Sequence, residues 1–427
     1  MLVYVWYPIL ASLATGFAFM NLAPFADDFM KLYDVGYGGL SFLLSALFWT
    51  HSQCQIPAGL IVDKFGAYRI MIVSSIGGIV TNIVPLLAPD SLSLAVSMRL
   101  ILGICTGLNF LAVLKIIGSL APPEKMAKSQ GYQGAAFGLG TMLPYLQITF
   151  VDGISWRWTY IICGLIFLMV LLGSMMLPNQ AKGQRDKPQS VPGSYNQELS
   201  SKSSIQKSSA VDSGVSFGGV LARLPSIIKT KELWALGILH GLSYGTLNSL
   251  GQWLPSIMSE LNNAPISTWS TATIIILLIG TASRSGSGPI LNLVSRRTAI
   301  LGVIVGLVLL YTGLGLIRLP WLALSIGAVL AAISGLNYGS IFNLGSRIMP
   351  VTYMATSLGF MIMVANLTNI GMTLILGLTK EHTGSFQLGL MAIGFSALIG
   401  LIAFSRLITL IDLKIGQNTD NPKVSET

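Results

Sequence analysis

Long apolar stretches dominate this chain of 427 residues and constrain its fold more than any other feature. A helix needs about 20 consecutive, mostly apolar residues to cross the core of a lipid bilayer. Such stretches recur along the whole sequence with short polar segments between them. Twelve can be marked, at residues 3–25, 38–60, 69–88, 93–117, 128–150, 157–177, 233–256, 267–291, 298–317, 320–345, 354–379 and 386–410. The sequence therefore predicts an all-α membrane protein with twelve transmembrane helices.

The composition disfavours the common soluble classes of protein. Hydrophobic residues make up 52% of the chain and charged residues only 10%, whereas a soluble domain carries about 25% charged residues. A mean hydropathy of +0.71 would leave large apolar patches on a globular surface. A soluble enzyme and a nucleic-acid-binding protein are therefore poor fits. The three cysteines all lie in predicted spans and match neither a disulfide framework nor a metal site, so we expect no metal and no cofactor.

Basic residues are distributed unevenly between the two sides of the predicted membrane. With the N-terminus inside, 18 of the 25 Lys and Arg fall in cytoplasmic segments, four on the opposite side and three within spans. Such an excess marks the cytoplasmic side. We therefore expect both termini in the cytoplasm and the chain in the plasma (inner) membrane. The first stretch is expected to remain as a span, because no basic residue precedes it as in a signal peptide.

A polar segment at 178–232 divides the spans into two sets of six. The predicted organisation is an N-terminal six-helix bundle at 1–177, a cytoplasmic linker at 178–232, a C-terminal six-helix bundle at 233–412 and a cytoplasmic tail at 413–427. Residues 178–216 are rich in Ser, Gln, Gly and Lys, which is typical of a flexible linker. Residues 217–231 mix apolar and basic side chains, which leaves open a short interfacial helix or a plain loop.

The two halves resemble each other in sequence at an offset of 228–229 residues. Gly59, Asp63 and Gly66 align with Gly288, Asn292 and Ser295, and the run from Gly107 to Phe110 aligns with the run from Gly335 to Tyr338. A parallel repeat of six-helix units is an architecture of secondary transporters, whose substrate site lies near the midplane between the halves. We therefore expect two pseudo-symmetric bundles with a site between them.

Two motifs resemble those of the major facilitator superfamily. The segment Gly59-Leu-Ile-Val-Asp63-Lys64-Phe-Gly66-Ala-Tyr-Arg69 is similar to the signature G-x-L-a-D-r-x-G-r-k/r that follows the second span in that family. The fourth span carries Arg99, Gly103 and Gly107 in the spacing R-x-x-x-G-x-x-x-G. A degenerate second copy of the first motif comprises Gly288, Asn292, Arg296 and Arg297. The resemblance covers the whole chain and implies the twelve-helix fold of that superfamily.

The first motif is expected to act as a gate between the two halves. Gly59 and Gly66 are expected to allow close approach of neighbouring helices. Asp63 lies at a helix end, where a carboxylate accepts hydrogen bonds from basic groups or from a neighbouring helix N-terminus. The resemblance implies that this network, with Lys64 and Arg69, holds the halves together in the outward-open state. The alternative for Asp63 is that it only caps a helix.

Ionisable residues inside the spans are the first candidates for a binding site, because a charge near the bilayer centre costs at least about 2.5–3.5 kcal/mol. Away from the span ends they are all basic, and no Asp or Glu lies within a span. Arg284 is expected to bind an anion through its guanidinium, or else to belong to the gate. The resemblance implies that Arg99 responds to substrate or coupling ion; the alternative is packing against backbone carbonyls. Lys115 is expected to extend its side chain towards the membrane surface.

Two histidines and several uncharged polar residues complete the candidate substrate site. Histidine titrates near neutral pH, so His51 or His240 can carry a proton, or each packs helices as a neutral, hydrogen-bonded side chain. Gln55 occupies the position in the first half that corresponds to Arg284. The uncharged candidates, which alternatively only join helices, are Gln55, Asn109, Tyr244, Asn248, Gln252, Asn337, Tyr338 and Asn366.

These observations predict a secondary active transporter that works by alternating access and is not an enzyme. Its expected solute is a small anion of the carboxylate type, with a proton as coupling ion in symport, because only basic groups are buried. The expected surroundings are the lipid bilayer, with no nucleic acid, and the expected state is a monomer. An anion exchanger, a facilitator, and a sensor that keeps the fold without transport remain alternatives.

Overall fold

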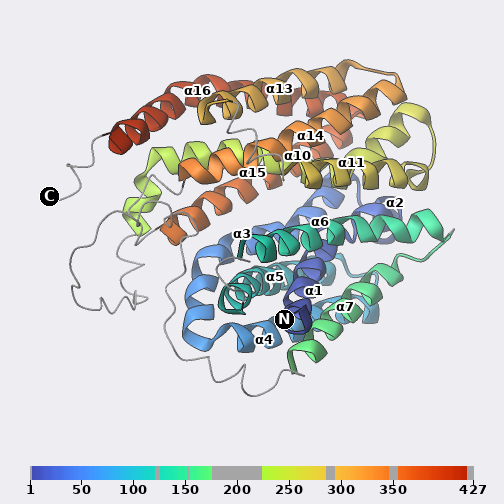
Figure 1. Ribbon diagram of the computed structural model, residues 1–427. Helices are drawn as coiled ribbons and strands as arrows, with labels where there is room; N and C mark the ends of the chain where they lie inside the picture. Colours follow the sequence, from blue (N-terminus) through green and yellow to red (C-terminus); the bar gives the residue numbers. More distant parts are fainter. Residues whose placement is uncertain are drawn as a thin grey trace.

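The computed structural model describes residues 2–120, 126–151, 153–175, 224–284, 294–345 and 354–420, and within these ranges every regular element is a helix (Figure 1). In chain order the elements are α1 (Leu2–Met20), η1 (Ala23–Phe25), α2 (Ala26–Tyr33), α3 (Tyr37–Phe65), α4 (Ala67–Leu87), α5 (Leu92–Leu120), α6 (Met126–Phe150), α7 (Arg157–Met175), α10 (Lys231–Asn262), η5 (Ile266–Trp269), α11 (Ser270–Ser283), α13 (Arg296–Leu316), α14 (Pro320–Gly345), α15 (Met354–Thr383) and α16 (Gln387–Asp420).

The helices form two bundles that repeat the same packing. In Figure 1 the first bundle, α1 to α7, lies below the second, α10 to α16. In the first bundle α1 packs on α6, α4 on α7 and α5 on α3; in the second, α10 packs on α15, α13 on α16 and α14 on α11. Contacts between bundles also come in an exchanged pair, α3 with α15 and α6 with α11. This correspondence confirms the prediction of two pseudo-symmetric bundles.

The starts of the helices follow the offset that the sequence repeat predicts. Helices α5 and α14 start 228 residues apart, at Leu92 and Pro320. Helices α4 and α13 start at Ala67 and Arg296, which are 229 residues apart. Equivalent helices therefore begin at equivalent places in the two halves, as expected if one six-helix unit underlies both.

Apolar side chains cover the outside of the helices as well as the interior. On α4, Val73, Ile76, Val80 and Ile83 are each about half exposed, and they recur on one helical face. Eight of the helices within the described ranges are long and apolar enough to cross a membrane. Because an apolar outer face is stable only against hydrocarbon, this pattern identifies an integral membrane protein.

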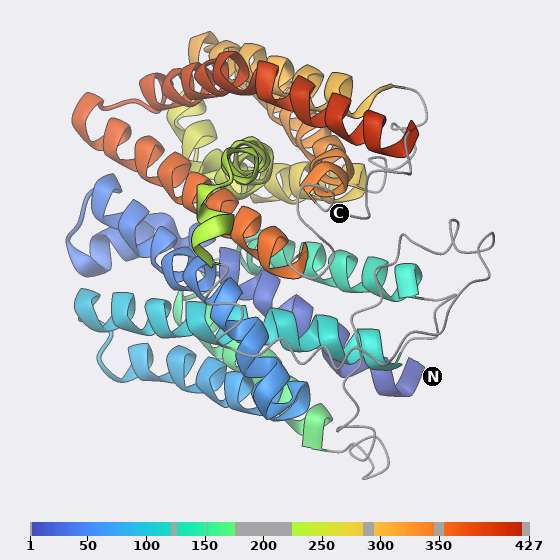
Figure 2. The same ribbon diagram turned by 90° about the vertical axis from the view of Figure 1, so that its left-hand side faces the viewer.

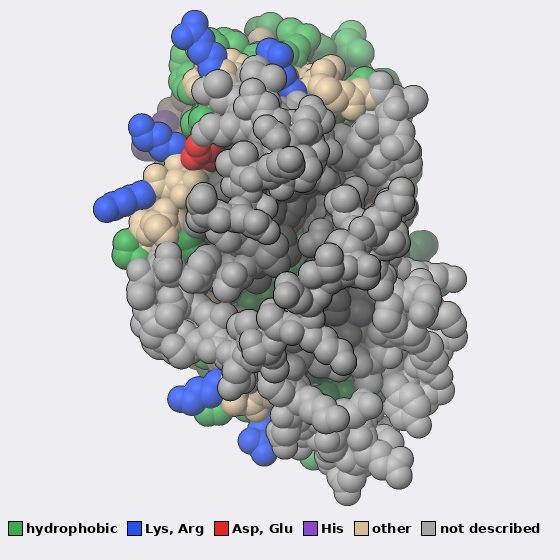
Figure 3. Space-filling view, turned by 60° about the vertical axis from the view of Figure 1, so that its left-hand side comes forward, with side chains coloured by type: hydrophobic (Ala, Val, Ile, Leu, Met, Phe, Trp, Pro, Cys, Tyr) green, Lys and Arg blue, Asp and Glu red, His purple; other side chains and the backbone are tan. Residues whose placement is uncertain are grey.

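The loops define two ends of the molecule. We call the end that holds both chain termini the terminal end, and the end with the α1–α3, α6–α7, α10–α11 and α15–α16 connections the distal end. Figure 2 shows both termini on its right-hand side. In Figure 3 the coloured Lys and Arg side chains lie towards the left-hand side of the view, away from the middle of the molecule. The side of the membrane that each end faces stays a prediction from the charge bias.

Some boundaries differ from those predicted. The first span breaks after Met20, and η1 and α2 continue the chain across the distal end. Helix α16 runs on to Asp420, through part of the segment expected as a tail. Residues 224–229 are helical, which favours the interfacial-helix interpretation for that part of the linker. Most of the predicted linker, up to residue 223, lies outside the described residues.

Candidate functional site

Polar side chains are buried where the two bundles meet. Helix α3 of the first bundle packs along α15 of the second, and α15 in turn packs on α10. The hydroxyl of Ser52 donates a hydrogen bond of 2.9 Å to the carbonyl oxygen of Met363, so α3 and α15 are joined directly. Buried histidine and amide side chains on α3, α10 and α15 flank this crossing. We take this region as the candidate site.

His51 lies in a complete hydrogen-bond chain on the first-bundle side. Its Nδ1 is 3.0 Å from Thr106 Oγ1 on α5, and its Nε2 is 2.9 Å from the amide nitrogen of Gln55. The Thr106 hydroxyl donates to the carbonyl oxygen of Gly103, so its oxygen accepts from the imidazole. Gln55 then donates to Nε2. The arrangement suits a neutral imidazole protonated at Nδ1, and its ring packs edge-on against Phe19 at 4.9 Å.

Arg284 lies near His240 and Tyr244 on the second-bundle side. It follows the last residue of α11, and its side chain is within electrostatic reach of both aromatic residues of α10. The rings of His240 and Tyr244 stack with centroids 5.9 Å apart. Thr281, one turn before Arg284, lies against Gly138 of α6. The cationic end of α11 therefore sits beside the crossing of α6 and α11 between the bundles.

Amide side chains on α10 and α15 extend this polar region. Asn248 donates to the carbonyl oxygen of Tyr244 at 3.2 Å, and Thr373 donates to the amide oxygen of Gln252 at 2.9 Å. Asn369 is fully buried, and neither polar atom of its amide group has a hydrogen-bond partner among the described residues. A buried amide without partners is costly, which makes it a candidate for contact with a solute.

Asn369 and Thr373 are further polar residues of this region that were not predicted from the sequence. The signal that identifies them is helical spacing: Asn366, Asn369 and Thr373 recur at intervals of three and four residues and so share one face of α15. Of the predicted residues on α10 and α15, the structure brings His240, Tyr244, Asn248, Gln252 and Asn366 into the same pair of packed helices.

Arg99 and Asn109 lie within the first bundle. The Arg99 side chain donates from Nη1 to the carbonyl oxygen of Ala18 at 2.8 Å and to Asn21 Oδ1 at 2.9 Å, both on the α1 side. Asn109 donates to the carbonyl oxygen of Ala11 at 3.0 Å. The structure therefore brings neither residue together with Arg284. For Arg99 this is the carbonyl-packed arrangement, and its role in substrate binding stays a prediction.

Several predicted site residues are described by the structure only in part or not at all. Gly288 and Asn292 fall in the segment 285–293, which is outside the described residues. The backbones of Asp63, Arg296, Asn337 and Tyr338 are helical, but their side chains are not described. The predicted second copy of the gate and the Asn109–Asn337 correspondence therefore stay predictions.

The described part of the gate motif centres on Gly66. This residue alone separates α3 from α4, with φ of 86°, a conformation that favours glycine. Its N–H donates to the carbonyl oxygen of Val62. Lys64 and Arg69 are exposed. The expected close helix approach is found at neither glycine: an added Cβ would meet only Leu111, at an ordinary 4.0 Å, at Gly59, and nothing within 4 Å at Gly66. The tight approach of α5 to α3 occurs at Gly103 instead.

A second group of polar residues joins the bundles at the distal end. Glu381, near the end of α15, accepts a hydrogen bond from the backbone N–H of Gly38 in the first turn of α3. Lys380 forms an ion pair of 2.9 Å with Glu260 of α10. Tyr37, the first residue of α3, packs against the second bundle, with its ring centroid 6.2 Å from that of Trp253 and 5.5 Å from that of Phe386. This distal contact, which sequence reasoning missed, closes the bundles at this end.

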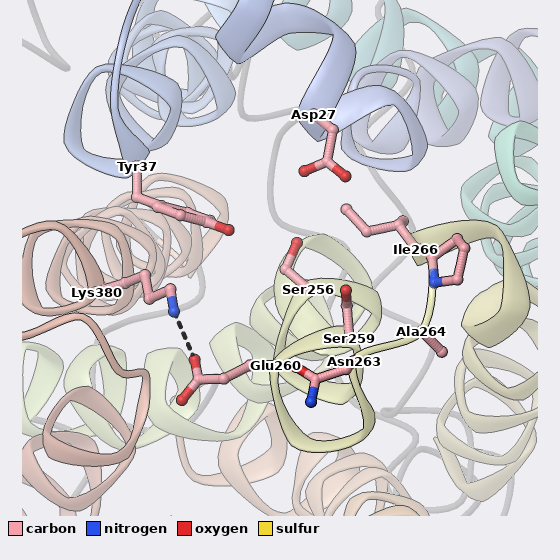
Figure 4. Close-up of a pocket in the computed structure, with 10 residues that line it drawn as sticks. Asp27, Tyr37, Ser256, Ser259, Glu260, Asn263, Ala264, Ile266 and Lys380 are labelled. Carbon is pink, nitrogen blue, oxygen red and sulfur yellow. Dashed lines mark hydrogen bonds and ion pairs between the residues drawn. The ribbon is translucent and has the colours of Figure 1, made fainter.

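A pocket of about 450 Å³ opens beside the distal contact. Figure 4 shows Asp27 and Tyr37 entering it from the first bundle, and Ser256, Ser259 and the Lys380–Glu260 pair from the second. Nearby, Tyr145 donates to the carbonyl oxygen of Gly251, and the hydroxyl oxygens of Thr149 and Ser270, at the distal ends of α6 and α11, are 2.7 Å apart. The pocket is therefore a shallow distal vestibule above interlocked helices.

The sequence matches the model of a known protein family. The model of the Major Facilitator Superfamily matches residues 9–373. A protein named as a probable sulfoacetate transporter, SauU of Cupriavidus necator, is 23% identical over 86% of this chain and 84% of its own length. The D-galactonate transporter of Escherichia coli is 25% identical over 38% of this chain and 39% of its own length.

Another relative matches over a shorter part of its length. The efflux pump notK of an Aspergillus species is 33% identical over 36% of this chain, a match that spans about a quarter of the pump, at 26%. The matches to notK and to the galactonate transporter thus leave most of those proteins uncovered.

Solved structures share the fold. A bacterial homologue of the human lysosomal transporter Spinster, inward-facing and unoccupied, superposes with a TM-score of 0.72 at 13% identity, covering 96% of this chain and 97% of that one. The inward-open xylose transporter XylE of E. coli superposes with a TM-score of 0.69 at 14% identity, over 93% and 94% of the two chains. At these identities the likeness concerns the fold.

Proposed function

Because this chain belongs to the major facilitator superfamily, and is thus a transporter and not an enzyme, we propose that it moves a small organic anion across the membrane by alternating access, coupled to a proton. The observation that carries the proposal is the group Arg284, His240 and Tyr244 beside the bundle crossing.

The chemistry of Arg284 favours a carboxylate or another oxyanion. A guanidinium presents paired N–H donors that match two oxygens of such a group. The Tyr244 hydroxyl near it, and the amides of Asn248 on α10 and Asn369 on α15, offer neutral hydrogen-bonding groups for a polar solute. The names of two relatives, the sulfoacetate and D-galactonate transporters, also point to organic anions. These names support the solute class and identify no particular solute.

The position of His240 supplies a mechanism for coupling. Arg284 lies within electrostatic reach of His240, so an anion held by Arg284 brings a negative charge close to the imidazole. That charge stabilises the imidazolium, and by linkage a protonated His240 strengthens anion binding by the same factor. One anion and one proton then cross together without moving net charge. Such symport responds to the pH gradient and not to the membrane voltage.

Counterflow of a labelled solute in proteoliposomes tests the anion. A panel of organic anions, cations and neutral sugars identifies which compound exchanges. Arg284→Gln is expected to abolish counterflow of the active anion, whereas Arg284→Lys, which keeps the charge but loses the paired donors, reduces it. Arg157→Gln, on an exposed distal residue, is the control and keeps full counterflow. Exchange restricted to cations or sugars would show that the anion proposal is wrong.

Proton uptake on binding tests the coupling. In weakly buffered solution the purified wild-type protein is expected to take up about one proton for each anion bound. His240→Gln is expected to bind the anion without proton uptake, and His51→Gln is expected to keep the uptake. If instead His51→Gln loses proton uptake and His240→Gln keeps it, His51 is the proton carrier and the assignment to His240 fails. If neither variant loses uptake, the coupling proposed here is wrong.

A further inference from the structure

A hollow of about 480 Å³ lies between α10 and α16 at the terminal end, remote from the bundle crossing. Lys231 and Trp234, in the first turn of α10, form one wall. The other wall is a stretch of α16 that carries Arg406 among apolar residues, with Phe404 and Leu407 both half-buried. Lys231, Trp234 and Arg406 are exposed, so the hollow opens outwards from the protein.

The hollow lies at the level where hydrocarbon gives way to lipid headgroups. The span predicted at 386–410 is near its end here, and Arg406 is the one Lys or Arg within that stretch. Helix α10 begins at Lys231, and its apolar sequence starts at Leu233. Tryptophan is enriched at this boundary because its ring is apolar and its N–H is polar. A molecule in the hollow would therefore touch charge at one end and hydrocarbon at the other.

The charges around the hollow are mainly positive. Lys231 and Arg406 line it, Lys229 lies two residues earlier in the chain, and Glu232 is the acidic neighbour on α10. The positive-inside bias predicts that this end faces the leaflet in which anionic lipids concentrate. An anionic headgroup placed between two cations, with its acyl chain along an apolar wall, matches both features of the hollow.

Trp234 is held in place by the protein. Its indole N–H donates to the carbonyl oxygen of Ile228 at 2.7 Å, and its ring stands edge-on to Phe360 of α15 at 5.2 Å. Phe360 belongs to a buried cluster with Ile227 and Leu233, and Ile56 of α3 packs against it. Figure 2 shows the short segment before α10, in light green, beside α15. The aromatic wall of the hollow is thus preorganised.

We propose that this hollow binds an anionic phospholipid, with the phosphodiester between Lys231 and Arg406 and the upper acyl chain against Trp234, Phe404 and Leu407. The paired cations recognise the negative charge, and the apolar wall recognises the chain. The assignment does not depend on which solute the protein carries. It rests on the lining of this hollow and on its place at the membrane boundary.

Fluorescence quenching by brominated lipid tests the proposal. The protein is placed in phosphatidylcholine nanodiscs containing a minor fraction of phosphatidylglycerol or phosphatidylcholine with brominated acyl chains. The signal of Trp234 is the difference between wild type and Trp234→Phe. We expect brominated phosphatidylglycerol to quench Trp234 several-fold more than brominated phosphatidylcholine at the same mole fraction. Trp321, which is 77% exposed at the distal start of α14, is expected to be quenched equally by both.

Variants and a soluble competitor separate the interpretations. Lys231→Ala/Arg406→Ala is expected to weaken the preference for phosphatidylglycerol by roughly tenfold or more, since each basic residue near an anionic surface contributes about fivefold. Lys64→Ala/Arg297→Ala, which removes two exposed cations at the same end, is the matched control and keeps the preference. Equal quenching by the two lipids, or a preference that survives the first variant, overturns the proposal. Loss of the preference on adding soluble glycerol phosphate shows a site for free phosphate and also overturns it.

Discussion

At the scale of single residues, the surroundings of the two arginines within the spans favour different roles for them. Arg99 and Arg284 occupy comparable places in the sequence, each in an apolar span without acidic neighbours. In Arg99 the Nη1 group donates to Ala18 and Asn21 inside the first bundle, whereas Nε and Nη2 have no hydrogen-bond partner among the described residues. Arg284 lies at the end of α11 beside the crossing of the bundles. We therefore expect different roles for the two arginines, structural for the first and solute-binding for the second.

Substitution of Arg99 distinguishes these roles. Arg99→Met removes two charge-assisted hydrogen bonds, each worth about 1.5–3 kcal/mol, and leaves the Asn21 oxygen without its donor. We expect a large loss of thermal stability in detergent, with Arg99→Lys intermediate because it restores only one bond. The control is Arg318→Met, on the distal loop between α13 and α14, which is expected to leave the stability unchanged. A stable Arg99→Met protein that fails to bind the anion would instead place Arg99 in the substrate site.

At the scale of helices, small residues set how closely the elements pack. A Cβ added at Gly103 of α5 would overlap Thr50 and the carbonyl oxygen of Leu47, both on α3. Backbones this close exclude any side chain, as is common where membrane helices associate through small residues. Close helix packing thus explains the glycine at position 103 in the motif of the fourth span. Gly59 in the gate motif, in contrast, has room for a methyl group.

Alanine substitution measures this packing. Gly103→Ala is expected to push α5 away from α3 and to destabilise the protein by about 1–3 kcal/mol or more. Gly302→Ala is the matched control, because Gly302 lies in helix α13 with nothing within 4 Å of its added Cβ. That variant is expected to be neutral or slightly stabilising. Thermal unfolding of the two purified proteins decides, and equal stability of both would contradict the packing argument.

At the scale of the whole molecule, the distal contact determines which end of the transporter is closed. Glu381 reaches from the second bundle to the start of α3 in the first, and Tyr37 packs against Trp253 and Phe386 across the same boundary. Opening at this end has to break these contacts. Because a carboxylate at a helix N-terminus is favoured by the helix dipole, Glu381 stabilises the distally closed state relative to the distally open one.

Removal of Glu381 is expected to favour distal opening. A Ser256→Cys reporter in the distal pocket, in a background without the three native cysteines, is labelled from the distal side with a membrane-impermeant maleimide. Glu381→Ala is expected to raise the labelling rate several-fold, because one hydrogen bond to a charged group contributes about 1.5–3 kcal/mol. Ser155→Cys, exposed on the distal loop between α6 and α7, reports general reactivity and is expected to label equally in both backgrounds. An unchanged rate at Ser256→Cys would show that Glu381 does not hold the distal end closed.

The sequence alone determined the number of spans, their order and the repeat that relates the halves, and the structure reproduces the 228-residue offset in the starts of α5 and α14. Membrane insertion depends on the summed transfer free energy of about 20 consecutive residues, which a sequence contains in full. The partners of each polar side chain were decided only by the tertiary structure. Glu381 meets Gly38 across 343 residues of chain, and Arg99 turns towards α1, because the rotation of each helix is set by packing against its neighbours. That rotation turns Asn369 and Thr373 of α15 towards α10. The hydropathy of a span does not tell which face of the helix meets a neighbouring helix.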